Sequence, residues 1–183
     1  MSLQVAFIVA VAVLFLAVVL YRQGRAWWRF RGQRVVTCPE TRQPAGVVVD
    51  ARHAGATALL GAPQLRLSAC SRWPDRAGCG EPCLGQIALS PEDCLVRHIL
   101  TDWYQGKACA SCGRPFGNIE WTAAKPALLL PSRVSAEWSQ VQADRLQETL
   151  QTAQPICFAC HTASAMIREH PDLVVDRSRG PIA

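Results

Sequence analysis

Charge is scarce in this sequence, and its first 21 residues carry none. Charged side chains make up 18% of the 183 residues, while half of the residues are hydrophobic. This balance argues against a disordered tail and against a chain that coats nucleic acid. The length suits one ordinary domain or two small ones, each with a core of its own.

Recognisable catalytic motifs are also missing. The sequence has no Gly-rich phosphate loop, no His-Glu-x-x-His pair and no nucleophile elbow. Asp50, Arg52 and His53 lie near one another, but three polar residues in an expected loop are weak evidence for catalysis. We therefore expect a binding or structural protein rather than an enzyme.

The uncharged N-terminal run is long enough to cross a membrane. Residues 3–21 contain Gln4 as their one strongly polar side chain, and 19 residues form a helix of about 28 Å. A secretory signal peptide is the competing interpretation. It requires basic residues before the run and a small-residue cleavage site after it, and neither is present. We predict an uncleaved anchor over residues 1–21.

A cluster of arginines follows the apolar run and indicates its orientation. The chain has 19 basic and 14 acidic residues, so the five arginines of residues 22–34 account for the whole net charge of +5. Positive charge beside a membrane span is retained on the cytoplasmic side. We expect the N-terminus outside and the remainder of the chain in the cytoplasm. The arginines are Arg22, Arg25, Arg29, Arg31 and Arg34.

The same charge distribution limits the expected partners. Because residues 35–183 are formally neutral, we expect no nucleic acid. The expected partners are the lipid bilayer and a membrane or cytoplasmic protein.

The remaining pattern is that of an α+β chain. Short apolar runs predict strands near 35–36, 47–49, 65–69, 116–121 and 127–130. Capping residues and apolar periodicity predict helices from Ser90 to about 105, over 135–152 and over 160–170. We divide the chain into a basic juxtamembrane segment 22–37, a Cys-rich strand and loop region 38–106 ending in a helix, a module 107–171 and a tail 172–183.

Two Cys-x-x-Cys pairs carry the strongest chemical signal. They are Cys109 with Cys112, followed by Gly113, and Cys157 with Cys160. A two-residue gap lets both sulfurs of a tight turn face one ion, and two such turns supply the four thiolates of structural zinc. We predict one metal site shared by the two pairs.

The first pair resembles the knuckle of zinc-ribbon and treble-clef modules, in which a Cys-x-x-Cys-Gly turn leads into a hairpin. The second pair resembles the treble-clef arrangement, in which the second pair opens a helix. The resemblance covers about residues 107–170 and identifies no named family. Residues 113–156 separate the pairs, which is more than compact ribbons use. The resemblance implies a metal-stapled fold without catalysis.

The second pair has another interpretation. Cys157-Phe-Ala-Cys160-His161 matches the pattern for covalent attachment of c-type haem, with His161 as an axial ligand. The expected cytoplasmic orientation opposes it, because that attachment resembles a process outside the cytoplasmic membrane. A reactive dithiol is a further alternative for either pair, although no βαβ pattern surrounds them.

Five further cysteines precede these pairs. Cys94 and His98 share a face of the expected helix, where Cys94 is expected to be buried. The other four form a candidate second metal site, and sequence does not distinguish zinc from an iron–sulfur cluster there. They are Cys38, Cys70, Cys79 and Cys83.

Together these features predict an α+β protein with a single N-terminal transmembrane helix followed by a small Cys-rich, metal-stapled domain. The expected function is a membrane-anchored, zinc-binding protein with a structural, scaffolding or assembly role. The alternative is an electron-transfer protein with c-type haem or an iron–sulfur cluster.

Overall fold

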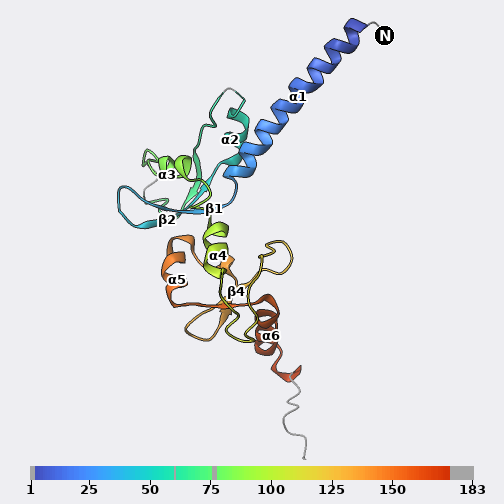
Figure 1. Cartoon of the computed structure of the whole chain (residues 1–183). Coiled ribbons are helices and arrows are strands. Elements are labelled where there is room, and N and C mark those ends of the chain that lie inside the picture. Colours follow the sequence, from blue (N-terminus) through green and yellow to red (C-terminus); the bar gives the residue numbers. More distant parts are fainter. Residues whose placement is uncertain (1–2, 60, 76–77, 174–183) are drawn as a thin grey trace, which may run out of the picture. The chain divides into compact units, whose positions relative to one another are not determined.

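The computed structural model describes residues 3–59, 61–75 and 78–173. The chain divides into two compact units, Met1–Ile99 and Leu100–Ala183. Each unit contains helices and strands, which confirms the mixed α+β class (Figure 1). Most of the expected tail, residues 174–183, lies outside the described residues.

Helix α1 (Leu3–Phe30) contains the uncharged run and continues through most of the arginine segment. Its 28 residues correspond to about 42 Å. Its side chains up to Tyr21 are almost all exposed, and Figure 1 shows this part of the helix extending away from the rest of its unit. The helix is long and apolar enough to cross a bilayer, as an anchor or as a signal sequence.

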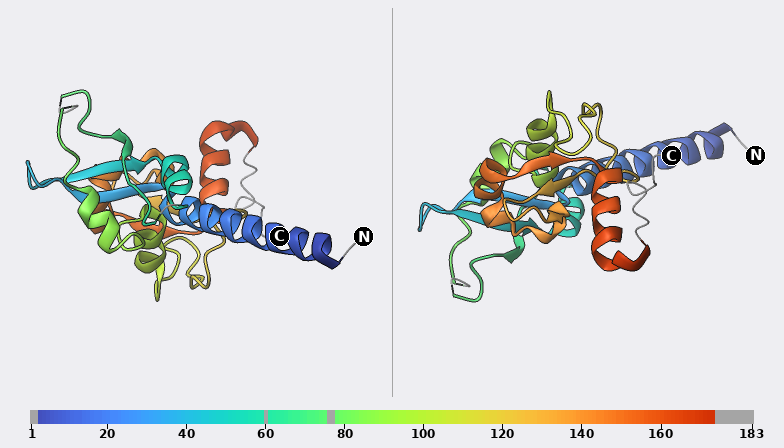
Figure 2. Two further views of the ribbon diagram at one scale, coloured as in Figure 1. Left: turned by 90° about the horizontal axis from the view of Figure 1, so that it is seen from above. Right: turned by 90° about the horizontal axis from the view of Figure 1, so that it is seen from below.

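The last turns of α1 pack against α2 (Ala51–Thr57), as both views of Figure 2 show. The packing is close because Gly55 faces α1: a Cβ there would lie 3.2 Å from the Gln23 carbonyl oxygen. The expectation of a loop around residues 50–53 is wrong. Asp50 caps α2 by accepting a hydrogen bond from the His53 N–H at 2.9 Å.

Three antiparallel strands form the sheet of the first unit, in the order β1-β2-β3. The bounds are β1 Gln33–Thr37, β2 Pro44–Val49 and β3 Leu67–Cys70, which confirm the three strands expected here. Apolar side chains from the sheet meet Phe30 of α1 and Ile87 in one core. The strand residues of this core are Val36, Ala45, Val47, Val49 and Leu67.

The helix expected to begin at Ser90 begins later. Ser90 instead follows a short helix, α3 (Leu84–Leu89), and α4 (Val96–Tyr104) starts after an intervening turn. The reason is a backbone pairing: the Val35 N–H donates to the Cys94 carbonyl at 2.8 Å. This pairing with β1 holds the segment before α4 in a non-helical conformation.

Arg34 differs from the other arginines near α1. It is fully buried, and its guanidinium donates to the carbonyls of Arg29, Phe30 and Gly32 at 2.7, 2.7 and 3.1 Å. In the sequence, Arg34 is one of the five arginines beside the apolar run. In the structure it caps the C-terminus of α1, whose last carbonyls have no partner within the helix.

The second unit is built on another three-stranded antiparallel sheet, in the order β5-β4-β6. The strands are β4 (Ala127–Leu129), β5 (Ser135–Ala136) and β6 (Gln154–Ile156). Helix α5 (Leu146–Thr152) precedes β6, and α6 (Phe158–Glu169) follows it. A short 3₁₀ turn, Pro171–Leu173, follows α6.

Two expectations for this unit are wrong in part. The helix expected over residues 135–152 forms only as α5, because Ser135 and Ala136 pair with β4 and two 3₁₀ turns follow, Trp138–Gln140 and Ala143–Arg145. Residues 116–121 form no strand. Phe116 instead packs against Tyr104, with the two ring centroids 4.9 Å apart, and the Trp121 indole donates to the Thr101 hydroxyl at 3.2 Å.

Candidate metal centre

The first Cys-x-x-Cys pair lies in a tight turn closed by backbone hydrogen bonds. The Cys109 N–H donates to the Arg114 carbonyl at 2.8 Å, and the Gly113 N–H donates to the Cys109 carbonyl at 2.8 Å. Gly113 adopts φ +73°, which side chains with a Cβ rarely tolerate. The glycine therefore lets the chain reverse directly after Cys112.

The second pair lies at the junction of β6 and α6. Cys157 is the N-cap of α6, and Cys160 lies in the first turn of that helix. A backbone hydrogen bond joins this junction to the first turn, since the Ala110 N–H donates to the Pro155 carbonyl at 2.8 Å. The fold thus places the two turns side by side although residues 113–156 separate them.

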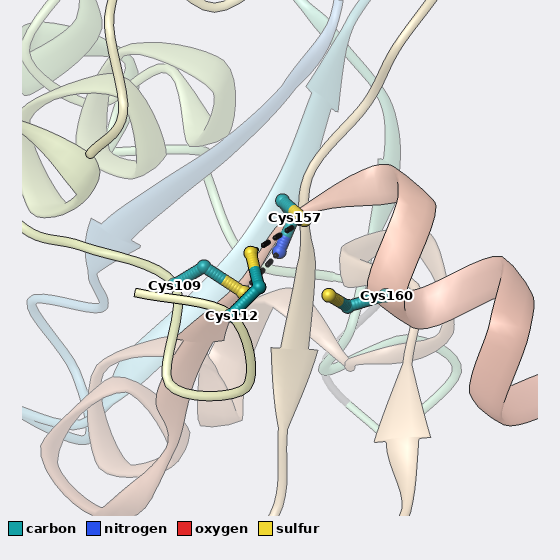
Figure 3. A group of neighbouring side chains, drawn as sticks. All are labelled: Cys109, Cys112, Cys157 and Cys160. Atoms are coloured by element: carbon teal, nitrogen blue, oxygen red, sulfur yellow. Dashed lines mark hydrogen bonds between the residues drawn. The ribbon is translucent and has the colours of Figure 1, made fainter. Parts of the chain in front are cut away.

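These two turns bring four thiols together (Figure 3). The four sulfurs all lie within 4.8 Å of one another, and the Sγ atoms of Cys112 and Cys157 are 3.8 Å apart. Four thiolates held tetrahedrally at the usual zinc–sulfur distance of about 2.3 Å would be about 3.8 Å apart, whereas a disulfide bond is about 2.05 Å long. The spacing is that of a metal site.

Hydrogen bonds prepare one of the sulfurs to be a thiolate. Burial acts to raise the pKa of the Cys109 thiol. The backbone N–H groups of Cys112, Cys157 and Ser111 outweigh burial by donating to the sulfur, and the pKa of Cys109 falls to about 6. For Cys160, the Ser111 hydroxyl acts to lower the pKa. The neighbouring thiols of Cys157 and Cys112 outweigh this effect, and the pKa rises to about 12.

The pKa values of Cys109 and Cys160 thus shift in opposite directions, for different reasons. Thiolates a few ångströms apart repel one another, so the four cannot all ionise near neutral pH unless a cation lies among them. A divalent ion would remove this repulsion and convert all four thiols into ligands. The group is therefore four cysteines placed to bind a metal ion.

The site lies at the margin of a small apolar cluster. Cys109 is 2% exposed and packs with Ala127 and Ile156, whereas Cys112 is exposed. An ion at this position would connect the first turn to the junction of β6 and α6.

His161, the expected axial ligand of the haem alternative, is directed to another partner. Its Nδ1 lies 2.9 Å from the hydroxyl of Ser135, a residue that is 4% exposed. Within the described residues, His161 does not belong to the group whose ligand atoms gather around the four sulfurs.

The remaining predicted ligands lie in the first unit. Cys83 is buried in the core of this unit, and Cys38, Cys70 and Cys94 pack against that core. Cys94 precedes α4 rather than lying within it, and its thiol donates to the Ser90 carbonyl at 3.3 Å. None of the nine cysteines, all within the described residues, forms a disulfide.

Sequence reasoning missed the structural use of Arg34, because a count of charges does not show which guanidinium is buried. The nearest signal in the sequence is the position of Arg34 shortly after the end of an apolar helix.

No family model, no curated protein and no solved structure matches this chain.

Proposed function

We propose that this chain is a single-pass membrane protein whose cytoplasmic part holds a structural zinc ion at its four C-terminal cysteines. Its role is to bind or scaffold a protein partner, as an accessory or assembly component at the membrane face. The observation that carries the proposal is the convergence of four sulfurs within 4.8 Å.

The donor set supports zinc in a structural rather than a catalytic site. Catalytic zinc keeps a ligand position open for water or substrate, whereas four protein thiolates complete a tetrahedral shell. The two turns also support the resemblance to zinc-ribbon and treble-clef modules, since the second pair opens α6 as in a treble clef. In this proposal, the segment that contains α5 is an insertion between the two pairs.

The end of α1 supports the cytoplasmic orientation. Arg22, Arg25 and Arg29 are exposed along this part of the helix. The Arg31 guanidinium lies 3.2 Å from the centre of the Trp28 ring. Arginine at the end of an apolar helix favours the cytoplasmic side, and tryptophan suits the headgroup layer.

Electron transfer is the second candidate function, and the four-thiol geometry favours iron over haem in it. Four thiolates also bind a single iron ion or an iron–sulfur cluster. Haem attachment would instead bond Cys157 and Cys160 to a porphyrin, and these sulfurs face the first pair (Figure 3).

Metal analysis and absorption spectroscopy of the full chain in detergent test the proposal. We expect a colourless protein with zinc at this site, and we expect Cys109→Ser and Cys160→Ser each to lose that zinc and to destabilise the second unit. A Soret band that survives denaturation would establish haem instead, and iron with visible absorption would establish electron transfer. If both variants keep full metal and stability, the shared site does not exist.

A reporter fused after Ala183 tests the orientation. The proposal predicts reporter activity only in the cytoplasm. Activity outside the membrane would refute the orientation and strengthen the haem alternative.

A further inference from the structure

The loop between β1 and β2 has the same backbone hydrogen bonds as the turn after Cys109. The Cys38 N–H donates to the Gln43 carbonyl at 2.9 Å, and the Arg42 N–H donates to the Cys38 carbonyl at 2.8 Å. These bonds join the same relative positions as those that close the turn after Cys109. Arg42 also has a positive φ of 56°, as Gly113 does at 73°. Cys38 thus begins a turn built like that of a metal-binding cysteine.

The sulfur of Cys38 receives the same kind of donors. The hydroxyl and N–H of Thr41 and the N–H of Glu40 donate hydrogen bonds to the Cys38 sulfur. These residues stand two and three positions after Cys38. The N–H groups at the same two positions after Cys109 donate to the Cys109 sulfur. Such donors stabilise a thiolate, the form that binds a metal.

Cys38, Cys70 and Cys83 meet at one core, in which Cys83 is buried and against which Cys38 and Cys70 pack. Strands β1 and β3 both run antiparallel to β2, so Cys38 directly after β1 and Cys70 at the end of β3 follow strands of one direction. The side chain of Gln86 in α3 makes two hydrogen bonds with the Thr37 backbone, at 2.6 and 3.1 Å. This contact places Cys83, one turn earlier in the chain, beside the end of β1.

Cys70 also has a backbone donor on its sulfur. The N–H of Arg72, two residues later, lies 3.5 Å from the Cys70 Sγ. Cys70 and Trp73 pack against the same core as Cys83. The sulfur of Cys70 is thus held at the edge of this core with a donor already in place.

Cys79 completes the group. It precedes Cys83 by four residues, and the turn between them is tied to β3 because the Glu81 carboxylate accepts from the Leu67 N–H at 3.0 Å. The Cys83 thiol is buried in the core of this unit and interacts electrostatically with Cys70, Cys79 and Cys38. The three other cysteines are therefore its ionisable neighbours.

We infer that these four cysteines form a second metal site, which takes a tetrahedral, thiolate-preferring divalent ion of the zinc class. The ligands are Cys38, Cys70, Cys79 and Cys83. Four protein thiolates again complete the tetrahedral coordination shell of the ion. The ion would therefore cross-link the β1–β2 hairpin, β3 and α3. The site lies wholly within the first unit and does not depend on the C-terminal site.

The first-unit cysteines are spaced more widely than the C-terminal ones. Among the described residues, only the C-terminal group has all its ligand atoms within 4.8 Å. An ion in the first unit would draw its four sulfurs to about 3.8 Å from one another. Order in this unit should therefore increase when the ion binds.

The test is the metal stoichiometry of the full chain, purified in detergent under reducing conditions and loaded with zinc. We expect two zinc ions per chain, and Cys79→Ser should lower this number to one. Cys79 is the best position because it does not belong to the buried core that contains Cys83. The matched control is Cys94→Ser, a fifth cysteine of the same unit whose bond to the Ser90 carbonyl a hydroxyl can replace; it should keep two ions.

Alkylation followed by mass spectrometry provides a second readout if Cys79→Ser folds poorly. Zinc should protect all four thiols of the wild-type chain from alkylation, and a chelator should expose them together. One zinc per chain that Cys109→Ser removes and Cys79→Ser leaves in place would overturn the second site while the proposed function stands. A disulfide among the four thiols after reduction and zinc loading would overturn it as well.

Discussion

The guanidinium of Arg34 donates to the carbonyl oxygen of Phe30 at 2.7 Å, in an environment that leaves Arg34 without solvent exposure. This contact joins the last residue of α1 to β1, the strand that follows it. The end of the apolar helix and the start of the sheet are thereby fixed relative to each other.

Replacing Arg34 should loosen this junction. Arg34→Gln removes several charge-assisted hydrogen bonds and leaves buried carbonyls without a donor, so we expect a loss of about 2–3 kcal/mol in the unfolding free energy of the first unit. Hydrogen exchange of the β1 and β2 amides in the full chain measures it. Arg31→Gln is the control, because Arg31 is partly exposed, and it should change exchange little. Equal effects of the two variants would contradict the capping role.

Replacing Gly113 should weaken metal binding. A Cβ at φ +73° strains the backbone, so Gly113→Ala should cost about 1–2 kcal/mol and lower zinc affinity roughly tenfold. Gly117→Ala is the matched control: Gly117 has no positive φ and nothing within 4 Å of a new Cβ. Competition with a zinc-binding dye measures both affinities. Unchanged affinity in Gly113→Ala would show that the turn does not need this conformation.

As the pH is lowered, zinc affinity should fall, and it should fall more steeply below about pH 6. Above that pH, Cys109 is already a thiolate, whereas Cys160, with its pKa near 12, releases its proton to solvent only when the ion binds. Below it, the ion must displace the proton of Cys109 as well. Each additional proton displaced adds a tenfold loss of affinity per pH unit. Affinities measured from pH 5 to 9 check this, and a constant slope through pH 6 would contradict the lowered pKa of Cys109.

A larger side chain at Gly55 should separate α2 from α1. A Cβ at this position would lie 3.2 Å from the Gln23 carbonyl oxygen and 3.5 Å from the Trp27 Cβ, so Gly55→Leu cannot fit without moving the helix. We expect a loss of about 1–3 kcal/mol. Thermal unfolding of the full chain in detergent measures it. Gly24→Ala in α1 is the control, because nothing lies within 4 Å of its new Cβ, and it should leave stability equal or higher.

The sequence predicts the C-terminal four-cysteine cluster well because the geometry of each cysteine pair is local. A two-residue gap and a following glycine determine the first turn, and the start of α6 positions the second pair. The apolar helix α1 is likewise evident from composition alone. What composition does not give is the hydrogen bond between Ala110 and Pro155, which joins turns far apart in the chain.

The errors in the predicted helices arise where pairing with a strand competes with a local signal for a helix start. Ser90 has the features of a helix start, yet pairing of Cys94 with Val35 delays α4. Ser135 also has a helix-starting side chain, but it pairs with Leu129 in the second sheet. In both places pairing with another strand overrides a local preference: at Cys94 the partner is distant in sequence, and at Ser135 it lies in the same short hairpin.

The hydrogen bond from Ala110 to Pro155 also bears on how fast an ion can be captured. Bringing the ends of a long loop together costs conformational entropy. Here the fold already holds the two ends of residues 113–156 together before an ion binds. Association should then be limited by loss of protons from the thiols rather than by a search of the chain for its own ends. Exposed Cys112 offers the first contact, and buried Cys109 the last bond to break.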